Sequence, residues 1–382
     1  MNTLHENRII YPILFGFFVM GFVDLVGIAT NYIKEDFALS DTSANLIPMM
    51  VFLWFALFSI PTGVLMEKIG KKQTVITALG ITSVAMLMPI LSYSFMNLLF
   101  AFALLGIGNT ILQVSLNPML AGVVSTGKVA GTLTLGQFIK SISSFLGPIV
   151  AGATAAFWGN WKLTFVFYAA VSALSTVWVY SYIPQDERGG EARTGFSSTL
   201  SMLKDRKIRF LFLGILFIVG IDVGLNTAIP NYLIARTGMP LSTAGLGSSL
   251  YFAFRTTGTF SSALLLARVK PQAYFRVNMG IAVLAFLFLL FVQVAGGLFT
   301  AISLLGFTCS SVFPILFSYA LQHRPERSNE ISALMIMGVS GGALVLPLMG
   351  MLSDGFGVTV GLSLLLLCLL YLATLSMMLH EK

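Results

Sequence analysis

The sequence predicts an all-α integral membrane protein with twelve transmembrane helices, arranged as two six-helix parallel repeats. Composition is the first reason, because 57% of the residues are hydrophobic and only 10% are charged, a balance that excludes an ordinary soluble domain. The apolar residues also come in blocks of about 20, the length that a helix needs to cross the hydrocarbon core of a bilayer. An internal repeat and a one-sided distribution of positive charge complete the prediction.

Apolar blocks and their breakers divide the chain into twelve spans. They are residues 9–33, 44–66, 73–92, 97–123, 128–157, 162–183, 210–234, 242–267, 275–294, 297–321, 330–352 and 358–379. The connections are short except for one of 26 residues, 184–209, which is rich in glycine, serine and charge. We therefore expect an N-terminal six-helix half over 1–183, a linker over 184–209 and a C-terminal six-helix half over 210–382.

Positive charge orients these spans. The net charge is +7, which would suggest a nucleic-acid partner if the basic residues were not in the short connections between spans. Seventeen of them fall on one side of the predicted membrane, and three, Lys34, Lys162 and Arg236, fall on the other. The positive-inside rule then places both termini and the linker in the cytoplasm. We expect a multi-pass protein of the cell membrane, the cytoplasmic membrane if the source is bacterial, with no nucleic-acid partner.

Several features recur after 200 residues. Asn31 and Tyr32 correspond to Asn231 and Tyr232, and residues 104–106 and 304–306 share the sequence Leu-Leu-Gly. Since six spans separate the copies, both copies cross the membrane in the same direction, which makes the repeat parallel. Transporters with this kind of repeat bind their solute near the bilayer midplane between the two halves.

The connection between spans 2 and 3 carries an acid and bases between glycines, from Gly63 through Glu67 to Gly70 and Lys71. This pattern resembles the loop signature of the major facilitators. The glycines permit a tight turn and close packing of helices, and Glu67 with Lys71 can form charge contacts that close one face of the protein. The alternative is an ordinary basic loop that obeys the positive-inside rule.

Four ionisable residues lie within predicted spans: Asp24 in span 1, Lys140 in span 5, Asp222 in span 7 and Arg255 in span 8. A charge in hydrocarbon is costly, so each is a candidate functional residue. Each half supplies one acid and one base, which suggests the pairs Asp24 with Lys140 and Asp222 with Arg255. The pairs could be structural. Alternatively, each ion pair could open and close during transport, so that its carboxylate takes up and releases a proton.

Uncharged polar residues are the candidates for contact with the solute. Amides both donate and accept hydrogen bonds, as sugar hydroxyls require, whereas the alternative role of such residues is to hold helices together. An aromatic ring such as Trp54 could stack on a sugar. The candidate amides are Gln113 and Asn117 in span 4, Gln137 in span 5, and Asn226 and Asn231 in span 7.

Motifs along nearly the whole chain resemble the fucose/galactose/glucose-proton symporter family of the major facilitators. They are Gly21 to Asp24, Gly106 to Gly108, Asn117-Pro118, Gly136 to Ser141, Asn226 to Ile234, Arg255 to Thr259, Phe313 to Ser318, and Gly341 to Asp354. The resemblance implies the major facilitator fold, a coupling role for Asp24, and sugar-facing amides at Gln137 and Asn226. Two positions depart from the family: Gln113 replaces a glutamate, and Lys140 replaces an amide.

These departures leave two interpretations of Lys140. It could hold Asp24 ionised until the solute arrives, or it could bind the carboxylate of an acidic sugar. Asp222 has no counterpart in the family motif, so its role is open; we list it with Asp24 as a candidate for proton coupling.

We predict a secondary active transporter that carries a sugar or sugar derivative with protons, or with sodium, by alternating access. A drug or metabolite/proton antiporter is the alternative within transport. The 26-residue linker is too short for a soluble signalling domain, which argues against a membrane sensor. An enzyme is not expected because the three histidines, His5, His323 and His380, all lie outside the spans. We expect no metal, no cofactor, and a monomer in the bilayer.

Overall fold

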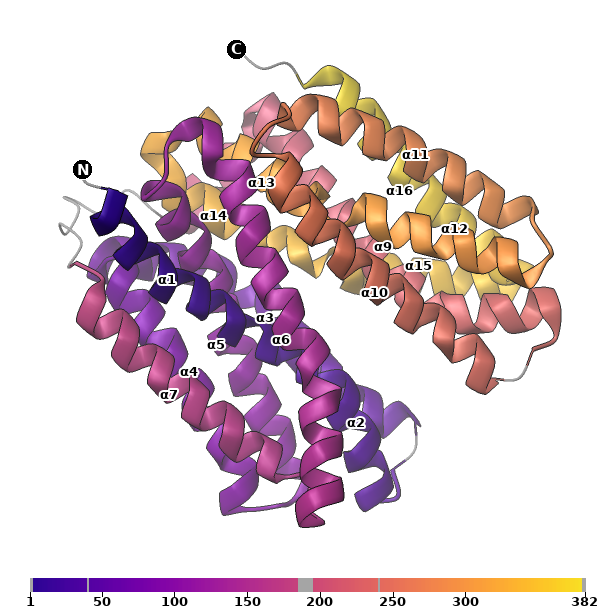
Figure 1. Cartoon of the computed structure of the whole chain (residues 1–382), viewed down its shortest axis with the longest axis horizontal. Helices are drawn as coiled ribbons and strands as arrows, with labels where there is room; N and C mark the ends of the chain where they lie inside the picture. Colours follow the sequence, from indigo (N-terminus) through magenta and orange to yellow (C-terminus); the bar gives the residue numbers. More distant parts are fainter. Residues whose placement is uncertain (1–2, 40, 185–194, 240, 380–382) are drawn as a thin grey trace. The chain divides into compact units, whose positions relative to one another are not determined.

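The computed structural model describes residues 3–39, 41–184, 195–239 and 241–379, and every regular element in these ranges is a helix (Figure 1). In the N-terminal part the helices are α1 (Thr3–Met20), η1 (Gly21–Asp24), α2 (Leu25–Asp36), α3 (Asp41–Ile69), α4 (Lys71–Leu91), α5 (Phe95–Gly122), η2 (Thr126–Lys128), α6 (Val129–Trp158) and α7 (Leu163–Tyr182). After the linker come α8 (Phe196–Ser201), η3 (Met202–Lys204), α9 (Arg206–Thr237), α10 (Leu241–Leu265), α11 (Pro271–Phe291), α12 (Ala295–Cys309), α13 (Val312–His323), η4 (Pro325–Arg327), α14 (Ser328–Met337), η5 (Gly338–Ser340), α15 (Gly341–Phe356) and α16 (Val358–Met378).

Each of the twelve predicted spans coincides with helix in the structure. Eleven segments of the described chain are long and apolar enough to cross a membrane. The twelfth span is α10, which is 25 residues long but contains Arg255 and many serines, threonines and glycines. Large apolar side chains such as Leu91 on α4, Phe291 on α11 and Leu367 on α16 are exposed on the protein surface. Contact of these apolar side chains with lipid is favourable, whereas their exposure to water would be unfavourable.

Three spans are interrupted, and the sequence did not predict these interruptions. Span 1 changes from α-helix to 3-10 helix at η1, span 10 turns at residues 310–311 between α12 and α13, and span 11 changes at η5. A short 3-10 segment within a helix shifts the backbone hydrogen bonds by one residue, which leaves polar groups that must bond elsewhere. In membrane transporters such breaks are tolerated where neighbouring groups satisfy the backbone.

The chain forms two compact units that exchange short segments. Unit 1 contains Met1–Thr126, Ile139–Met202 and Arg324–Met337, and unit 2 contains Gly127–Phe138, Leu203–His323 and Gly338–Lys382. Each unit is therefore built mainly from one half of the sequence plus the start of one span from the other. The division into halves at residues 1–183 and 210–382, which the sequence repeat suggested, stays a prediction. Part of the predicted linker is helical, as α8 and η3, and span 7 begins earlier than expected, at Arg206.

The same helix contacts recur in the two units. In unit 1, α4 packs against α5 and α7, and in unit 2, α11 packs against α12 and α16, as Figure 1 shows in the purple and the orange-to-yellow parts of the chain. The repeat extends to single glycines. A Cβ atom at Gly106 would overlap the carbonyl oxygen of Val51, and one at Gly306 would overlap the carbonyl oxygen of Tyr251. Gly306 lies 200 positions after Gly106, and Tyr251 lies 200 positions after Val51. The same contact therefore occurs at equivalent positions of the two halves, which confirms the parallel repeat.

The conformation of Gly70 explains why the loop signature has a glycine at this second position. Its φ of 83° lies in the left-handed region, and it separates the last residue of α3, Ile69, from the first residue of α4, Lys71. A residue with a Cβ atom would be strained in this conformation. The glycine therefore permits a one-residue connection between two long antiparallel helices, with Glu67 and Lys71 on either side of the turn.

We expect Gly106→Ala and Gly306→Ala to destabilise the protein to a similar extent, by about 1–3 kcal/mol each, because each added methyl group would force two helices apart. Melting temperature in detergent measures the effect. Gly80→Ala and Gly280→Ala are matched controls, since these helical glycines are also 200 positions apart and have open space at the Cβ position. The controls should be neutral or stabilising by about 0.5–1 kcal/mol. Equal losses in all four variants would contradict close packing at Gly106 and Gly306.

Candidate functional site

The interruption of span 1 places Asp24 at the end of a 3-10 turn. Asn109 on α5 donates a hydrogen bond of 2.6 Å from Nδ2 to the carbonyl oxygen of Met20, the residue just before η1. This bond satisfies a polar backbone group beside the break, in a region that contains no water to do so. Asn109 therefore supports the geometry that presents Asp24.

Helix α6 crosses span 1 at the break. A Cβ atom at Gly21 would lie 2.5 Å from the carbonyl oxygen of Lys140, so only glycine allows this approach. One turn further along α6, the hydroxyl of Ser144 has two acceptors within reach for its single proton: Oδ2 of Asp24 and, at 3.0 Å, the carbonyl oxygen of Lys140. The carboxylate of Asp24 is itself exposed. Ser144 was not among the residues predicted for the site.

The ion pair expected between Asp24 and Lys140 is not formed. Side chains on a helix lean toward its N-terminus, and spans 1 and 5 run in the same direction. The backbone carbonyl of Lys140 is the group that approaches Gly21, and Ser144, one turn further along α6, reaches the carboxylate of Asp24. The presence of one acid and one base in each half suggested the pair, but it does not show which side chains meet.

Gln137, Lys140 and Ser144 follow one face of α6, since they are three and four residues apart. An amide, an ammonium group and a hydroxyl thus line one stripe, with Asp24 at its outer end. Trp54 on α3 has an indole nitrogen that is buried and has no hydrogen-bond partner within the described parts of the chain. Its ring packs edge-on against Phe58, with 5.3 Å between the ring centroids.

The span 4 amides are bonded within their own helix. Nε2 of Gln113 donates to Oδ1 of Asn109 at 2.8 Å, and Nδ2 of Asn117 donates to the carbonyl oxygen of Gln113 at 2.6 Å. Both side chains are buried. This arrangement supports a packing role for Gln113 and Asn117 more than contact with a solute.

A second polar cluster lies in unit 2 around Asp222. Arg255 on α10 donates to Oδ2 of Asp222 at 2.5 Å, and the hydroxyl of the fully buried Tyr251 donates to Oδ1 at 2.5 Å. The Asp222 side chain is 15% exposed and that of Arg255 is 30% exposed. The sequence suggested this ion pair, but it did not single out the hydrogen bond from Tyr251.

The span 7 amides lie further along α9. Asn226 is one turn beyond Asp222 on the same face of the helix, and its carbonyl oxygen accepts a hydrogen bond from Ser248 of α10. The side chain of Asn231 lies outside the described residues. No group of three or more His, Cys, Asp or Glu side chains in the described ranges is arranged to hold a metal.

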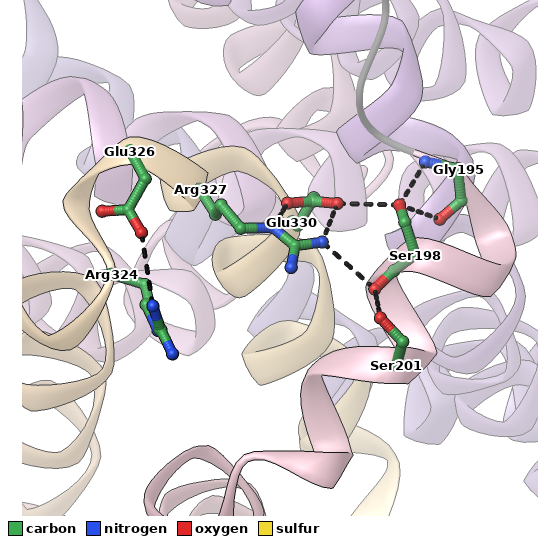
Figure 2. Close-up of polar contacts among 7 residues, drawn as sticks. All are labelled: Gly195, Ser198, Ser201, Arg324, Glu326, Arg327 and Glu330. Atoms are coloured by element: carbon green, nitrogen blue, oxygen red, sulfur yellow. Dashed lines mark hydrogen bonds and ion pairs between the residues drawn. The ribbon is translucent and has the colours of Figure 1, made fainter.

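A third cluster joins the start of span 11 to the short helix α8, within unit 1. Figure 2 shows Glu330 between Arg327 and Ser198. Arg327 binds both carboxylate oxygens of Glu330, one of them at 2.5 Å, and the Ser198 hydroxyl donates to Oε1 at 2.7 Å. Glu330 is only 1% exposed, and Glu67 of the loop signature adds an electrostatic attraction to Arg327. The sequence analysis did not single out this pair, although the three-residue spacing of Arg327 and Glu330 at a helix start is a signal that could have indicated it.

Comparisons with known proteins agree with this architecture. A family model described as Major Facilitator Superfamily matches residues 13–347. The glucose/galactose transporter of Brucella abortus biovar 1 (strain 9-941) is 25% identical over 376 residues, covering 94% of this chain and 90% of that protein. The L-fucose-proton symporter of Escherichia coli K12 is 24% identical, covering 85% and 82%. A crystal structure of the E. coli fucose:proton symporter has a TM-score of 0.84 at 18% identity, with 98% of each chain covered.

We expect Glu330→Ala to destabilise the protein by about 1–3 kcal/mol, because it leaves the Arg327 and Ser198 donors without their buried acceptor. Melting temperature in detergent measures the loss. Glu326→Ala is the matched control, since Glu326 belongs to the same turn but is 58% exposed and lies 3.9 Å from Arg324 in a surface ion pair. Such a pair contributes roughly 0–1 kcal/mol. A loss no larger than that of the control would show that the cluster around Glu330 does not hold α8 in place.

Proposed function

Because the chain belongs to the major facilitator superfamily, a family of transporters, we propose that it moves a sugar or sugar derivative across the membrane together with protons, by alternating access. The observation that carries this proposal is Asp24, an exposed carboxylate at a break in span 1 that is held by a hydroxyl and flanked by an amide and a cation on α6. The names of the relatives, a glucose/galactose transporter and a fucose-proton symporter, support a sugar as the solute.

Asp24 suits proton exchange because of the kind of partner it has. A serine hydroxyl can donate a hydrogen bond to a carboxylate and can equally accept one from a protonated carboxyl group. Ser144 therefore tolerates Asp24 in either state. In this proposal, Asp24 takes up a proton on the side of higher proton concentration and releases it on the other.

Asp222 has the opposite kind of partner. An arginine guanidinium can only donate, so Arg255 favours the ionised carboxylate and provides nothing for a protonated one. The hydroxyl of Tyr251 bonds to the other carboxylate oxygen, so both oxygens of Asp222 are held in place. We therefore assign Asp222 and Arg255 a structural role, holding α9 against α10, rather than the supporting role in proton coupling that the sequence suggested.

Other predicted residues receive roles within the same proposal. Gln137, Asn226 and the unpartnered indole nitrogen of Trp54 are the proposed donors to sugar hydroxyls, since each is a polar group on a membrane span. Glu67 and Lys71, together with Arg327 and Glu330, form a proposed gate whose contacts change between the two access states. We further propose that the protein is a monomer with both termini in the cytoplasm, in a bacterial cytoplasmic membrane, and that protons rather than sodium drive it.

Asp24→Asn should abolish coupling while leaving the protein folded. With one proton per sugar, a gradient of one pH unit can support about tenfold accumulation, because 1.4 kcal/mol corresponds to a factor of ten. We expect wild-type protein in proteoliposomes to approach this ratio with a labelled sugar, and Asp24→Asn to fall to a ratio of about one while still exchanging sugar. Glu35→Gln, at an exposed carboxylate on α2, is the control and should behave as wild type. Accumulation that still follows the pH gradient in Asp24→Asn would exclude Asp24 as the proton carrier.

A double-mutant cycle tests the structural role of the second cluster. Asp222→Asn leaves Arg255 without its counter-ion and should destabilise the protein by roughly 1–3 kcal/mol, a value reduced because the guanidinium is partly exposed. Adding Arg255→Gln should restore most of the melting temperature. Uptake by the double variant should still depend on the pH gradient. If the double variant folds but has lost that dependence, Asp222 takes part in proton coupling.

A further inference from the structure

Lys140 is a cation within a membrane span that lacks an ionic partner. In the ranges that the structure describes, no carboxylate lies at ion-pair distance from its ammonium group, although the other three membrane charges have specific partners. A charged side chain inside the membrane costs several kcal/mol unless a counter-ion or water compensates it. The carboxylate of Asp24, the membrane acid expected to pair with Lys140, accepts a hydrogen bond from Ser144, one turn further along α6.

We infer that the solute supplies the missing negative charge, and that the transported sugar is a sugar acid whose carboxylate binds Lys140. This inference rests on the proposed function and specifies its substrate class. A neutral sugar offers only hydroxyl groups, which cannot balance an ammonium ion desolvated by the bound solute. A sugar acid offers a carboxylate for Lys140 and hydroxyl groups for the neighbouring amide of Gln137. Lysine suits this role, since it is a point charge with three donors.

The charges of Asp24 and Lys140 then explain why sugar and proton move together. The empty site contains one negative and one positive charge, so its net charge is zero. The loaded site contains a protonated Asp24 and a Lys140-carboxylate pair, and its net charge is again zero. A site holding only the proton or only the sugar acid carries one net charge, which low dielectric surroundings disfavour. Tyr168 on α7 also lies within electrostatic reach of Asp24, but a phenol is neutral at physiological pH and does not alter this balance.

Transport of one sugar acid with one proton moves no net charge, whereas transport of a neutral sugar with a proton moves one positive charge. The two substrate classes therefore differ in their response to membrane potential. Electroneutral uptake is the signature expected of the sugar acid.

The experiment compares uptake of labelled D-glucuronate with D-glucose, and of D-galacturonate with D-galactose, in proteoliposomes with an inward proton gradient. Each pair differs only in a carboxylate against a hydroxymethyl group. We expect wild type to prefer the uronate of at least one pair by tenfold or more in kcat/KM. Potassium gradients with valinomycin, which set the membrane potential, should leave its uptake unchanged. Lys140→Asn should remove the preference, and Lys140→Arg should retain most of it.

Each outcome separates the inference from the proposed function. Uptake of neutral sugars that equals or exceeds that of the uronates, or uptake that follows the membrane potential, would overturn the sugar acid and leave sugar-proton symport standing. No saturable uptake of any of the four sugars would overturn both. Thermal shifts on adding each sugar to detergent-solubilised wild type and Lys140→Asn provide a binding measurement that does not depend on transport. If Lys140→Asn fails to fold, the comparison of sugars in wild type still decides the question.

Discussion

The absence of water from the bilayer core is the constraint on which the rest of this structure depends. Every polar group within a span must find its partner inside the protein. Asn109 satisfies the Met20 carbonyl where span 1 changes to a 3-10 turn, and Ser332 on α14 donates to the Val114 carbonyl of α5 at 2.5 Å. The irregular turn at η1 is therefore possible because α5 brings an amide to it. The same constraint underlies the proposal for Lys140, which has no ion-pair partner among the described residues.

Most of the fold was predictable because hydrophobic length, charge asymmetry and the repeat are properties of whole segments. The twelve spans and the parallel repeat follow from them, and the glycines of the repeat mark close helix crossings. The breaks in spans 1, 10 and 11 were not predictable, because the hydropathy of an interrupted span is the same as that of a continuous one. Likewise, the exchange of segments 127–138 and 324–337 between the units depends on tertiary packing, which leaves no periodic signal in the sequence.

The sequence identified the charged residues of the candidate site, but it did not show which residues contact one another. The four membrane charges were identified because ionisable groups are rare in spans, and two of them, Asp222 and Arg255, meet as charge balance suggests. Asp24 and Lys140 do not meet, and Ser144, one turn further along α6, bonds to Asp24 instead. Ser144 was missed since serine and threonine hydroxyls on membrane helices often bond to their own backbone, as Thr110 and Ser115 do here. Nothing in the sequence marks Tyr251 as a partner of Asp222. Only tertiary structure shows which hydroxyl faces a carboxylate.

Comparison of the halves shows that the duplication preserved packing while the charges diverged. Val51 and Tyr251 present the same carbonyl to Gly106 and Gly306, but only Tyr251 has a hydroxyl, and that hydroxyl binds Asp222. At the positions 200 residues from Asp222 and Arg255, the first half has Phe22 and Phe55. The same backbone contact thus accompanies an ion pair in one half, whereas the other half has two buried phenylalanines at the corresponding positions. In the first half, the partner of Asp24 among the described residues is the hydroxyl of Ser144, which can donate to a carboxylate or accept from a carboxyl group and so suits the proton exchange proposed for this residue.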